Sequence, residues 1–249
     1  MKIAPVSAGA IFVTKLTYMA RFALTDIHGC ALTLKALVQE QLKLKKEDEL
    51  YILGDLINKG PDSKGVIDYI LELQEEKYTV KCLRGNHDQM LIDARRKGDK
   101  ATNLIPEEKV LTLQSFGIEE YDELPKKYFK FLDSLEYYLE LHDYFLVHAG
   151  FNFSNKNIFK DRDAMLNIRD YKINWDALQQ KRLLHGHTPT ALYNIKKAVA
   201  HQEQRINLDA GCVYYKNAPF GNLVALNLDS MELFIQSNLD KPYNGGRKN

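Results

Sequence analysis

The sequence predicts an α/β (α+β) fold, for three reasons. Short apolar runs alternate with helical patterns in the first third of the chain, which is typical of successive βαβ units. After Pro189 the apolar runs are short and separated by turn residues, which is typical of antiparallel strands. Short polar clusters stand where the expected strands end, and ligands of open α/β sheets bind beyond such ends. The chain has 249 residues, 45% of them apolar, so we expect one large domain over 19–239.

The expected elements follow one another in order along the chain. Strands are expected over 21–25, 50–53 and 79–83, joined by amphipathic helices over 32–41 and 64–76. Segment 91–138 is rich in charge and tyrosine, with breaks at Pro106 and Pro125, and predicts helices that cap the sheet. Further strands over 144–147 and 182–184 each end at a histidine, and runs over 198–200, 206–208, 223–228 and 233–235 predict an antiparallel second sheet.

The charges and the cysteines argue against several classes of protein. Lys plus Arg number 34 and Asp plus Glu 33, so the net charge of +1 gives no reason to expect nucleic acid or an acidic membrane as a partner. Cys30, Cys82 and Cys212 are an odd number without C-x-x-C spacing. This argues against a disulfide framework and a structural zinc site, and it favours a cytoplasmic location.

Both ends of the chain are expected to lie outside the domain. The uncharged stretch within residues 1–18 is too short to span a bilayer. A disordered or upstream-start extension, with Met19 as the start, fits it better than a signal peptide does. Residues 240–249 include one proline and two glycines and are expected to form a loose tail.

Five polar clusters at the expected strand ends contain the residue types of a two-metal site. They are Asp26-Ile27-His28-Gly29, Gly54-Asp55, Gly85-Asn86-His87-Asp88, His148-Ala149-Gly150 and Gly186-His187. Any single cluster is more often a helix cap or a turn. Six compatible ligands, each just after an expected strand, favour a metal site instead.

The spacing of these ligands predicts two neighbouring cations. Asp26 and His28 can grip one cation from the same side, and Asp55 can bridge it to a second. Asn86, His148 and His187 can complete the second site. Carboxylate, amide and imidazole ligands suit Mn²⁺, Fe or Zn²⁺, and a pair of such ions is the arrangement used to hydrolyse phosphate esters.

Longer motifs surround the clusters and carry a family resemblance. They are Asp26-Ile27-His28-Gly29, Gly54-Asp55-Leu56-Ile57-Asn58-Lys59-Gly60, Leu83-Arg84-Gly85-Asn86-His87-Asp88, Val147-His148-Ala149-Gly150, His185-Gly186-His187-Thr188 and Leu208-Asp209-Ala210-Gly211-Cys212-Val213. In this order they resemble the calcineurin-like metallophosphoesterase superfamily, in the branch of phosphoprotein phosphatases, bacterial serine/threonine protein phosphatases and symmetrical diadenosine tetraphosphatases. The resemblance implies a four-layer αββα sandwich, with two mixed β-sheets flanked by helices and the metal site at the strand carboxyl ends.

The resemblance also implies how the metal site works. Asp26, His28 and Asp55 would hold one metal, and Asp55, Asn86, His148 and His187 the other, with Mn²⁺ the most expected ion and Fe or Zn²⁺ as alternatives. A metal-bridging hydroxide would attack phosphorus directly, without a covalent enzyme intermediate.

Further residues match groups that act on the substrate. His87 matches the general acid that protonates the departing oxygen. Arg84 and Arg169 match arginines that clamp phosphate oxygens through a planar, bidentate fork. His185 is expected to support the metal ligand His187.

The sequence departs from the family pattern at two places. Asn58-Lys59 replaces the usual Asp-Arg, so Asn58 can hydrogen-bond to His87 but cannot supply negative charge, and the catalytic pair is either weakened or completed by another partner. Lys59 keeps a positive charge for phosphate but lacks the fork. Thr25 stands where the family more often has glycine.

Three functions are compatible with these residues. The preferred one is a serine/threonine protein phosphatase acting on phosphorylated proteins or peptides, because of Arg169 and the His-Gly-His-Thr motif. The alternative is symmetrical hydrolysis of dinucleoside tetraphosphates, which the Gly60-Pro61 pair and the third and fourth clusters fit at least as well. A module that binds phosphate without turnover is the third, because Asn58 and Lys59 replace groups that the chemistry normally uses.

Overall fold

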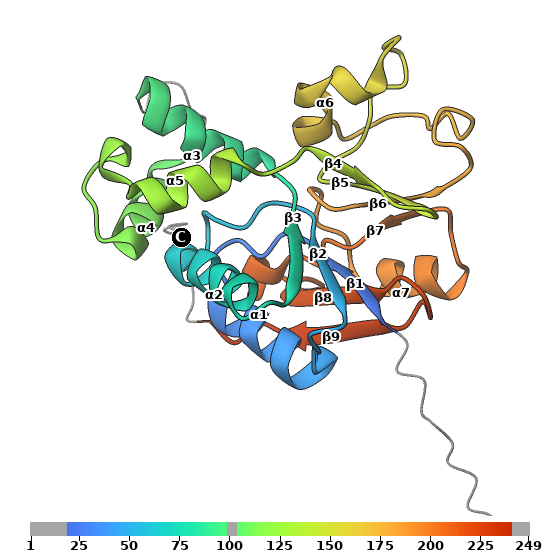
Figure 1. Ribbon diagram of the computed structural model, residues 1–249, viewed down its shortest axis with the longest axis horizontal. Helices are drawn as coiled ribbons and strands as arrows, with labels where there is room; N and C mark the ends of the chain where they lie inside the picture. The colour runs from blue at the N-terminus through green and yellow to red at the C-terminus, as the bar shows by residue number, and fades with distance from the viewer. Residues whose placement is uncertain (1–18, 99–103, 241–249) are drawn as a thin grey trace, which may run out of the picture.

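Two β-sheets lie face to face with helices on their outer sides, as shown in a computed structural model that describes residues 19–98 and 104–240 (Figure 1). The first sheet has the strand order β3-β2-β1-β8-β9 and the second β4-β5-β6-β7. Both sheets mix parallel and antiparallel pairs, which confirms the expected αββα arrangement of mixed sheets.

The elements of the first sheet and its helices come mainly from the first half of the chain. They are β1 (Arg21–Leu24), α1 (Ala31–Ala36), η1 (Leu37–Leu42), β2 (Glu49–Ile52), α2 (Ser63–Glu75), β3 (Thr79–Cys82), α3 (Asn86–Lys97), α4 (Pro106–Phe116), η3 (Tyr121–Glu123) and α5 (Lys126–Asp133). The rest are β4 (Tyr138–Glu140), β5 (Tyr144–Val147), η4 (Ile158–Lys160), α6 (Arg162–Asn167), β6 (Arg182–His185), α7 (Leu192–Ala200), β7 (Arg205–Asn207), η5 (Cys212–Tyr214), β8 (Asn222–Asn227) and β9 (Leu233–Ser237).

Alternation along the strands divides the core into layers. Ala23 of β1 packs with Leu146 of β5 in the cluster between the two sheets. Leu24, the next residue of β1, packs instead against the helices that cover the first sheet. Val147 of β5 likewise points into the cluster on the outer face of the second sheet. Successive side chains of a strand point to opposite faces of the sheet. Both faces of each sheet are covered by other elements, so these strands carry apolar side chains on both faces.

The site is positioned by parallel strands whose carboxyl ends lie side by side. β1, β2 and β3 pair in parallel, with Leu24 opposite Ile52 and Ile52 opposite Cys82. In the second sheet β5, β6 and β7 are also parallel, with Leu146 opposite Leu184. The loops that follow β1, β2, β3, β5 and β6 therefore leave the sheets along neighbouring edges, as expected for a ligand site in an open sheet.

Two expectations for the second half of the chain are wrong. Residues 198–200 belong to helix α7, in which Ile195 and Val199 lie four residues apart and are buried together. β7 pairs in parallel with β6, whereas β8 and β9 form an antiparallel hairpin that joins the first sheet through β1. There is thus no separate antiparallel sheet in the described part of the chain.

The segment over 91–138, expected to be a helical cap, contains α4, α5 and the larger part of α3, and its last residue begins strand β4. Both prolines stand where helices start rather than where they break. Pro106 is the first residue of α4 and Pro125 is the N-cap of α5, positions where the missing N–H costs nothing.

Asp240, the last residue that the structure describes, is anchored, although we expected it to begin a loose tail. Its carboxylate accepts hydrogen bonds from the backbone N–H of Leu32 and of Thr33 at the start of α1 and from the Thr33 hydroxyl. The expected amino-terminal extension and the remainder of the tail lie outside the described residues. Among the helices of the described residues, none is long and apolar enough to cross a membrane.

Candidate dinuclear metal centre

Asp55 joins two groups of buried ligand atoms. One group is His28, Asp55 and His87, the other Asp55, His148 and His187, and within each group the candidate ligand atoms lie within 4.8 Å of one another. Asp55 Oδ2 is 3.4 Å from His28 Nε2, and Asp55 Oδ1 is 3.5 Å from His148 Nε2. The two oxygens of one carboxylate therefore face two different imidazoles, which is the geometry of a bridging ligand.

Backbone carbonyls orient the first two histidines. His28 Nδ1 lies 3.1 Å from the carbonyl oxygen of Ile57, and His148 Nδ1 lies 3.0 Å from that of Leu53. A ring that donates its Nδ1–H to a carbonyl keeps its Nε2 lone pair free, and in both histidines that atom faces Asp55. Such a hydrogen bond is the usual support of a metal-ligating imidazole.

The second group is completed by an amide oxygen. Asn86 Oδ1 lies 3.0 Å from His148 Nε2 and 3.0 Å from His187 Nδ1, and the two ring nitrogens are 3.2 Å apart. Three electron-rich atoms that converge in this way need a cation or shared protons between them. Burial lowers the pKa of His187 to about 3, so the ring is neutral and suited to bind a metal.

Asp26 lies at the edge of the first group. Its Oδ1 is 3.9 Å from His28 Nε2. Its Oδ2 accepts hydrogen bonds from the Thr25 hydroxyl at 2.6 Å and from the backbone N–H of His187 at 3.0 Å. Thr25, which departs from the family pattern, thus holds this carboxylate in place. The first group includes His87, which we expected as a proton donor, and does not include the expected ligand Asp26.

The residues present fit two divalent cations. Burial raises the pKa of Asp26 and of Asp209, and the charge of a neighbouring aspartate adds to the rise in each. Carboxyl groups packed in this way are ionised only when positive charge lies between or beside them. The ligand set of carboxylate, amide and imidazole without thiolate suits Mn²⁺, Fe or Zn²⁺.

Strained backbone accompanies this site. Among the non-glycine residues with positive φ are Asp26 (54°), His28 (47°), Asp55 (52°), Asn58 (67°), Lys59 (64°) and His187 (72°). Left-handed conformations of this kind cost energy and persist where surrounding contacts enforce them, which happens most often at functional sites. The loops after β1, β2 and β6 are therefore held in unusual shapes that aim their side chains at one point.

Two glycines are needed because the loops approach one another closely. A Cβ atom on Gly85 would lie 2.1 Å from the backbone nitrogen of Asp55 and 2.2 Å from its Oδ1. A Cβ atom on Gly186 would lie 2.1 Å from Asp26 Oδ2. Neither position can hold a side chain without moving a candidate ligand.

His87 lies between the candidate metal ligands and Asn58. Its backbone N–H donates to Asp55 Oδ1 at 2.9 Å, and its ring meets that of His28 edge-on, with centroids 4.9 Å apart. Asn58 Nδ2 is 3.4 Å from His87 Nδ1, so the structure brings together the expected proton donor and its expected partner. Burial lowers the pKa of His87 to about 4, with the charge of Asp55 opposing that change.

Lys59 reaches into the same cluster. Its ammonium lies 2.9 Å from His28 Nε2. Burial opposes its charge, but Asp55 and other acidic groups outweigh that effect and the pKa of Lys59 is raised. A positive charge is therefore present beside the bridging carboxylate, where an anionic substrate would be attracted.

The two arginines expected to bind phosphate differ from one another. Arg84 is buried and donates to Gln89, to the Tyr137 hydroxyl and to the carbonyl oxygen of Asp133, with its guanidinium 4.9 Å from the Tyr137 ring centroid. The structure thus places Arg84 in a network between α3, α5 and the segment before β4. Arg169 is exposed and donates to the Thr188 hydroxyl at 3.0 Å, directly beside His187.

His185 lies outside the ligand groups of the described residues and contacts the loop that carries them. Its Nε2 accepts from Arg205 Nε at 2.9 Å, and its Nδ1 is 3.1 Å from the carbonyl oxygen of Gly186. Burial and the Arg205 charge lower the pKa of His185 to about 3.

Three residues at the site were not singled out from the sequence. Asp88 accepts from the backbone N–H of Leu56 and of Gly85, which ties together the loops after β2 and β3. Its place in the Gly-Asn-His-Asp motif could have indicated this role. From helix α4, Glu108 reaches His87 and Thr112 reaches Asn58. No local sequence motif indicates these contacts.

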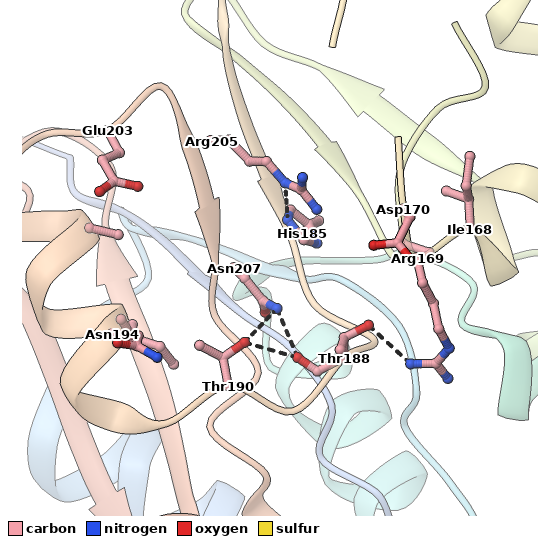
Figure 2. Close-up of a pocket in the computed structure, with 13 residues that line it drawn as sticks. Ile168, Arg169, Asp170, His185, Thr188, Thr190, Asn194, Glu203, Arg205 and Asn207 are labelled. Atoms are coloured by element: carbon pink, nitrogen blue, oxygen red, sulfur yellow. Dashed lines mark hydrogen bonds between the residues drawn. The ribbon is translucent and has the colours of Figure 1, made fainter. Parts of the chain in front are cut away.

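A pocket of about 530 Å³ opens beside Arg169 and Thr188. Figure 2 shows Arg205 and Asn207 on its walls, with Asn207 hydrogen-bonded to Thr188 and Thr190. Thr188 follows the candidate ligand His187 in the chain, so one wall of the pocket is continuous with a loop that carries a candidate ligand. Its volume lies in the range of small-molecule sites.

Known proteins share sequence with this chain. Residues 21–217 match the family model described as calcineurin-like phosphoesterase. The symmetrical bis(5'-nucleosyl)-tetraphosphatase of Buchnera aphidicola subsp. Schizaphis graminum is 40% identical over 74 residues, which cover 30% of this chain and 26% of that protein. Its counterpart in Pseudomonas syringae pv. syringae is 35% identical over 79 residues, covering 32% of this chain and 26% of that protein. The chain thus matches about a quarter of the length of these relatives.

Solved structures share the fold. A protein described as a candidate diadenosine tetraphosphatase has a TM-score of 0.59 at 20% identity, over 91% of this chain and 96% of that one. The cold-active protein-tyrosine phosphatase of a Shewanella species has a TM-score of 0.59 at 16% identity, over 87% of this chain and 77% of that one. These similarities concern the fold.

Proposed function

The chain belongs to the calcineurin-like phosphoesterase family, and on that premise we propose that it hydrolyses phosphoric esters with two divalent cations. The observation that carries the proposal is the position of Asp55, whose two oxygens face two separate sets of ligand atoms. The proposed ligands are Asp26, His28, Asp55, Asn86, His148 and His187. Two cations held in this way supply Lewis-acid polarisation of the phosphoryl group and activation of water near neutral pH.

The remaining residues of the site bind and orient the substrate. Lys59 and Arg169 offer positive charge on two sides of the ligand cluster, which suits an anionic phosphoryl group. His87 gives a proton to the departing oxygen. Its ring is neutral in the absence of substrate, and the negative charge of a bound phosphoryl group favours the protonated form.

We propose a dinucleoside tetraphosphate as the substrate, cleaved symmetrically. This reverses the order expected from the sequence, which put phosphorylated proteins first. The relatives that match at 35–40% identity are named for this activity. The pocket beside Arg169 and Thr188 supports the same choice, because a nucleoside attached to the reacting phosphate chain needs a concave site of its own (Figure 2).

A direct comparison of substrates tests this proposal. ADP release from diadenosine tetraphosphate and phosphate release from a phosphothreonine peptide are measured with the same Mn²⁺-loaded protein. We expect kcat/KM to favour the dinucleotide by about tenfold or more, which corresponds to about 1.4 kcal/mol of transition-state binding. A preference for the peptide would restore the protein phosphatase as the better assignment.

Two variants control this comparison. Asp55→Asn removes the bridging carboxylate and should lower hydrolysis of both substrates by about 10³-fold or more. Asp122→Asn, which removes an exposed carboxylate far along the chain from the clusters, should leave both rates unchanged. Mn²⁺ binding without hydrolysis of either substrate would instead identify a phosphate-binding module.

A further inference from the structure

We propose that Glu108, on helix α4, is the carboxylate partner of His87 and positions its ring for proton transfer. The inference rests on the function proposed above, because His87 is taken as the proton donor to the leaving group. Glu108 then completes a catalytic pair that the sequence left incomplete at Asn58. It acts through His87 and does not touch the reacting atoms.

Asn58 presents the wrong kind of group to the histidine. Its Oδ1 accepts from the Thr112 hydroxyl at 2.7 Å, and its Nδ2 donates to the backbone oxygen of His87 at 3.2 Å. The same Nδ2 lies 3.4 Å from His87 Nδ1. An amide N–H cannot accept a hydrogen bond, so Asn58 can hold an unprotonated Nδ1 but offers nothing to a protonated one.

Glu108 supplies the missing acceptor on that side of the ring. Its Oε2 lies 3.9 Å from His87 Nδ1, and the two side chains are only 12% and 11% exposed. When the ring is protonated, the contact at this separation becomes an ion pair, either direct or through one bridging water. Because the pair is largely screened from solvent, the attraction is stronger than that of a surface pair at the same distance.

Helix α4 carries both the Glu108 carboxylate and Thr112, whose hydroxyl hydrogen-bonds to the Asn58 amide. Glu108 and Thr112 are four residues apart and therefore lie on one face of the helix. The Thr112 hydroxyl contacts the backbone oxygen of Glu108 at 2.9 Å as well as Asn58. Ser115, one turn closer to the end of α4, accepts from the backbone N–H of Lys64 and docks the helix on α2.

The proposed step is balanced without any change at Glu108. As the P–O bond to the leaving group breaks, a proton moves from the His87 ring to the departing oxygen, and the electron pair of the broken bond stays on that oxygen. The ring becomes neutral. The Glu108 carboxylate remains ionised throughout and holds the remaining ring N–H in place.

Aryl phosphates with different leaving groups test this role. p-Nitrophenolate leaves readily without a proton, whereas phenolate, the conjugate base of a group with a pKa of about 10, needs one. In the Mn²⁺-loaded protein, Glu108→Gln should lower kcat for phenyl phosphate by roughly 10²-fold and kcat for p-nitrophenyl phosphate by less than about threefold, with KM nearly unchanged. Glu107→Gln removes the same charge from the exposed neighbouring residue and should change neither rate.

A carboxylate placed at residue 58 should compensate for the loss of the carboxylate at Glu108. Asn58→Asp in the Glu108→Gln background restores a carboxylate beside Nδ1 and should return the phenyl phosphate rate to within about tenfold of the original. Equal losses for both aryl phosphates, a change in KM alone, or failure of this rescue would overturn the proposal. Mn²⁺ stoichiometry, measured by calorimetry, should be the same in all variants.

A measurement without catalysis keeps the inference separate from the proposed function. The ¹⁵N resonances of the His87 ring, identified through their loss in His87→Gln, should shift in Glu108→Gln and stay in place in Glu107→Gln. An unshifted ring signal contradicts the pairing even in an active enzyme. Inactivity towards both aryl phosphates, together with a shifted signal, would refute the proposed function and leave the pairing intact.

Discussion

Lys59 donates to His28 through a 2.9 Å contact between Nζ and Nε2, the same ring nitrogen that faces the bridging carboxylate of Asp55. The His28 lone pair can serve either the lysine or a metal ion, but not both at once. Binding of a cation at this side of the cluster therefore requires the ammonium to leave His28. Under the proposed function, Lys59 would both compete with the metal for His28 and supply a positive charge for the substrate.

Replacing Lys59 should separate these two effects. In Lys59→Met the competing donor and its charge are gone, so Mn²⁺ should bind roughly tenfold more tightly in calorimetric titrations of the metal-free protein. KM for an anionic substrate should rise at the same time, because a phosphate-binding charge is lost. Lys97→Met, at an exposed lysine, should change neither quantity. Unchanged Mn²⁺ affinity in Lys59→Met would show that the hydrogen bond to His28 does not compete with metal.

The close approach of two loops makes Gly186 a sensitive position. In Gly186→Ala the new Cβ atom would lie 2.1 Å from Asp26 Oδ2 and 2.4 Å from Thr25 Oγ1, so the carboxylate must move. We expect Mn²⁺ affinity to fall by about 10–100-fold. Gly98→Ala is the matched control, because its φ of +80° makes alanine costly by about 1 kcal/mol while no atom lies within 4 Å of the added Cβ. If both variants bind Mn²⁺ equally well, the Asp26 position is not important for metal binding.

The sequence predicts strands β1 to β3 of the first sheet better than it predicts the pairing of the strands that follow Pro189. Strands β1 to β3 alternate with helices and pair with their neighbours in the chain, so local patterns contain the necessary information. The pairing of β8 with β1 joins residues some 200 positions apart, as in Phe22 with Asn227. A short apolar run does not indicate which distant strand it pairs with. It can also form one face of a helix, as it does at Val199.

The same contrast holds within the site. The six expected ligands lie within four residues after the end of a strand, so the strand ends predict where they gather. Glu108 and Thr112 reach the site only because α4 docks against α2, and Thr25 supports Asp26 through a hydroxyl that no motif demands. Local sequence does not predict the hydrogen-bond network around Arg84 either, because its partners Asp133 and Tyr137 come from the capping segment.

The pKa of His185 predicts how the metal-free protein responds to acid. The pKa is about 3 in the folded protein and about 6.5 in an unfolded chain, so only the unfolded chain takes up this proton as pH falls below about 6.5. Between pH 7 and pH 5 this histidine alone should remove about 2 kcal/mol of stability. Between pH 7 and pH 5, the free energy of unfolding of His185→Gln should therefore fall by about 2 kcal/mol less than that of the original protein. Urea unfolding with a chelator present measures this difference. Identical losses in the two proteins would mean that His185 is not buried as a neutral ring.

Arg84 and Arg169 should respond in opposite ways when each is replaced by alanine. Arg84 is buried with hydrogen bonds to Gln89, Tyr137 and the backbone of Asp133, so Arg84→Ala should lower the free energy of unfolding by about 2–4 kcal/mol. Arg169 is exposed, so Arg169→Ala should leave stability within about 0.5 kcal/mol.

Activity should show the reverse order, measured as kcat/KM per folded molecule at a temperature where both variants are folded. Arg169→Ala should lower kcat/KM for diadenosine tetraphosphate by roughly 10–100-fold, because Arg169 lines the pocket and hydrogen-bonds to Thr188, the residue after the candidate ligand His187. Arg84→Ala should lower it much less, since the donors of Arg84 are used within the protein. A large loss in Arg84→Ala with unchanged stability would instead establish Arg84 as a phosphate clamp, which requires its side chain to leave the network before substrate binds.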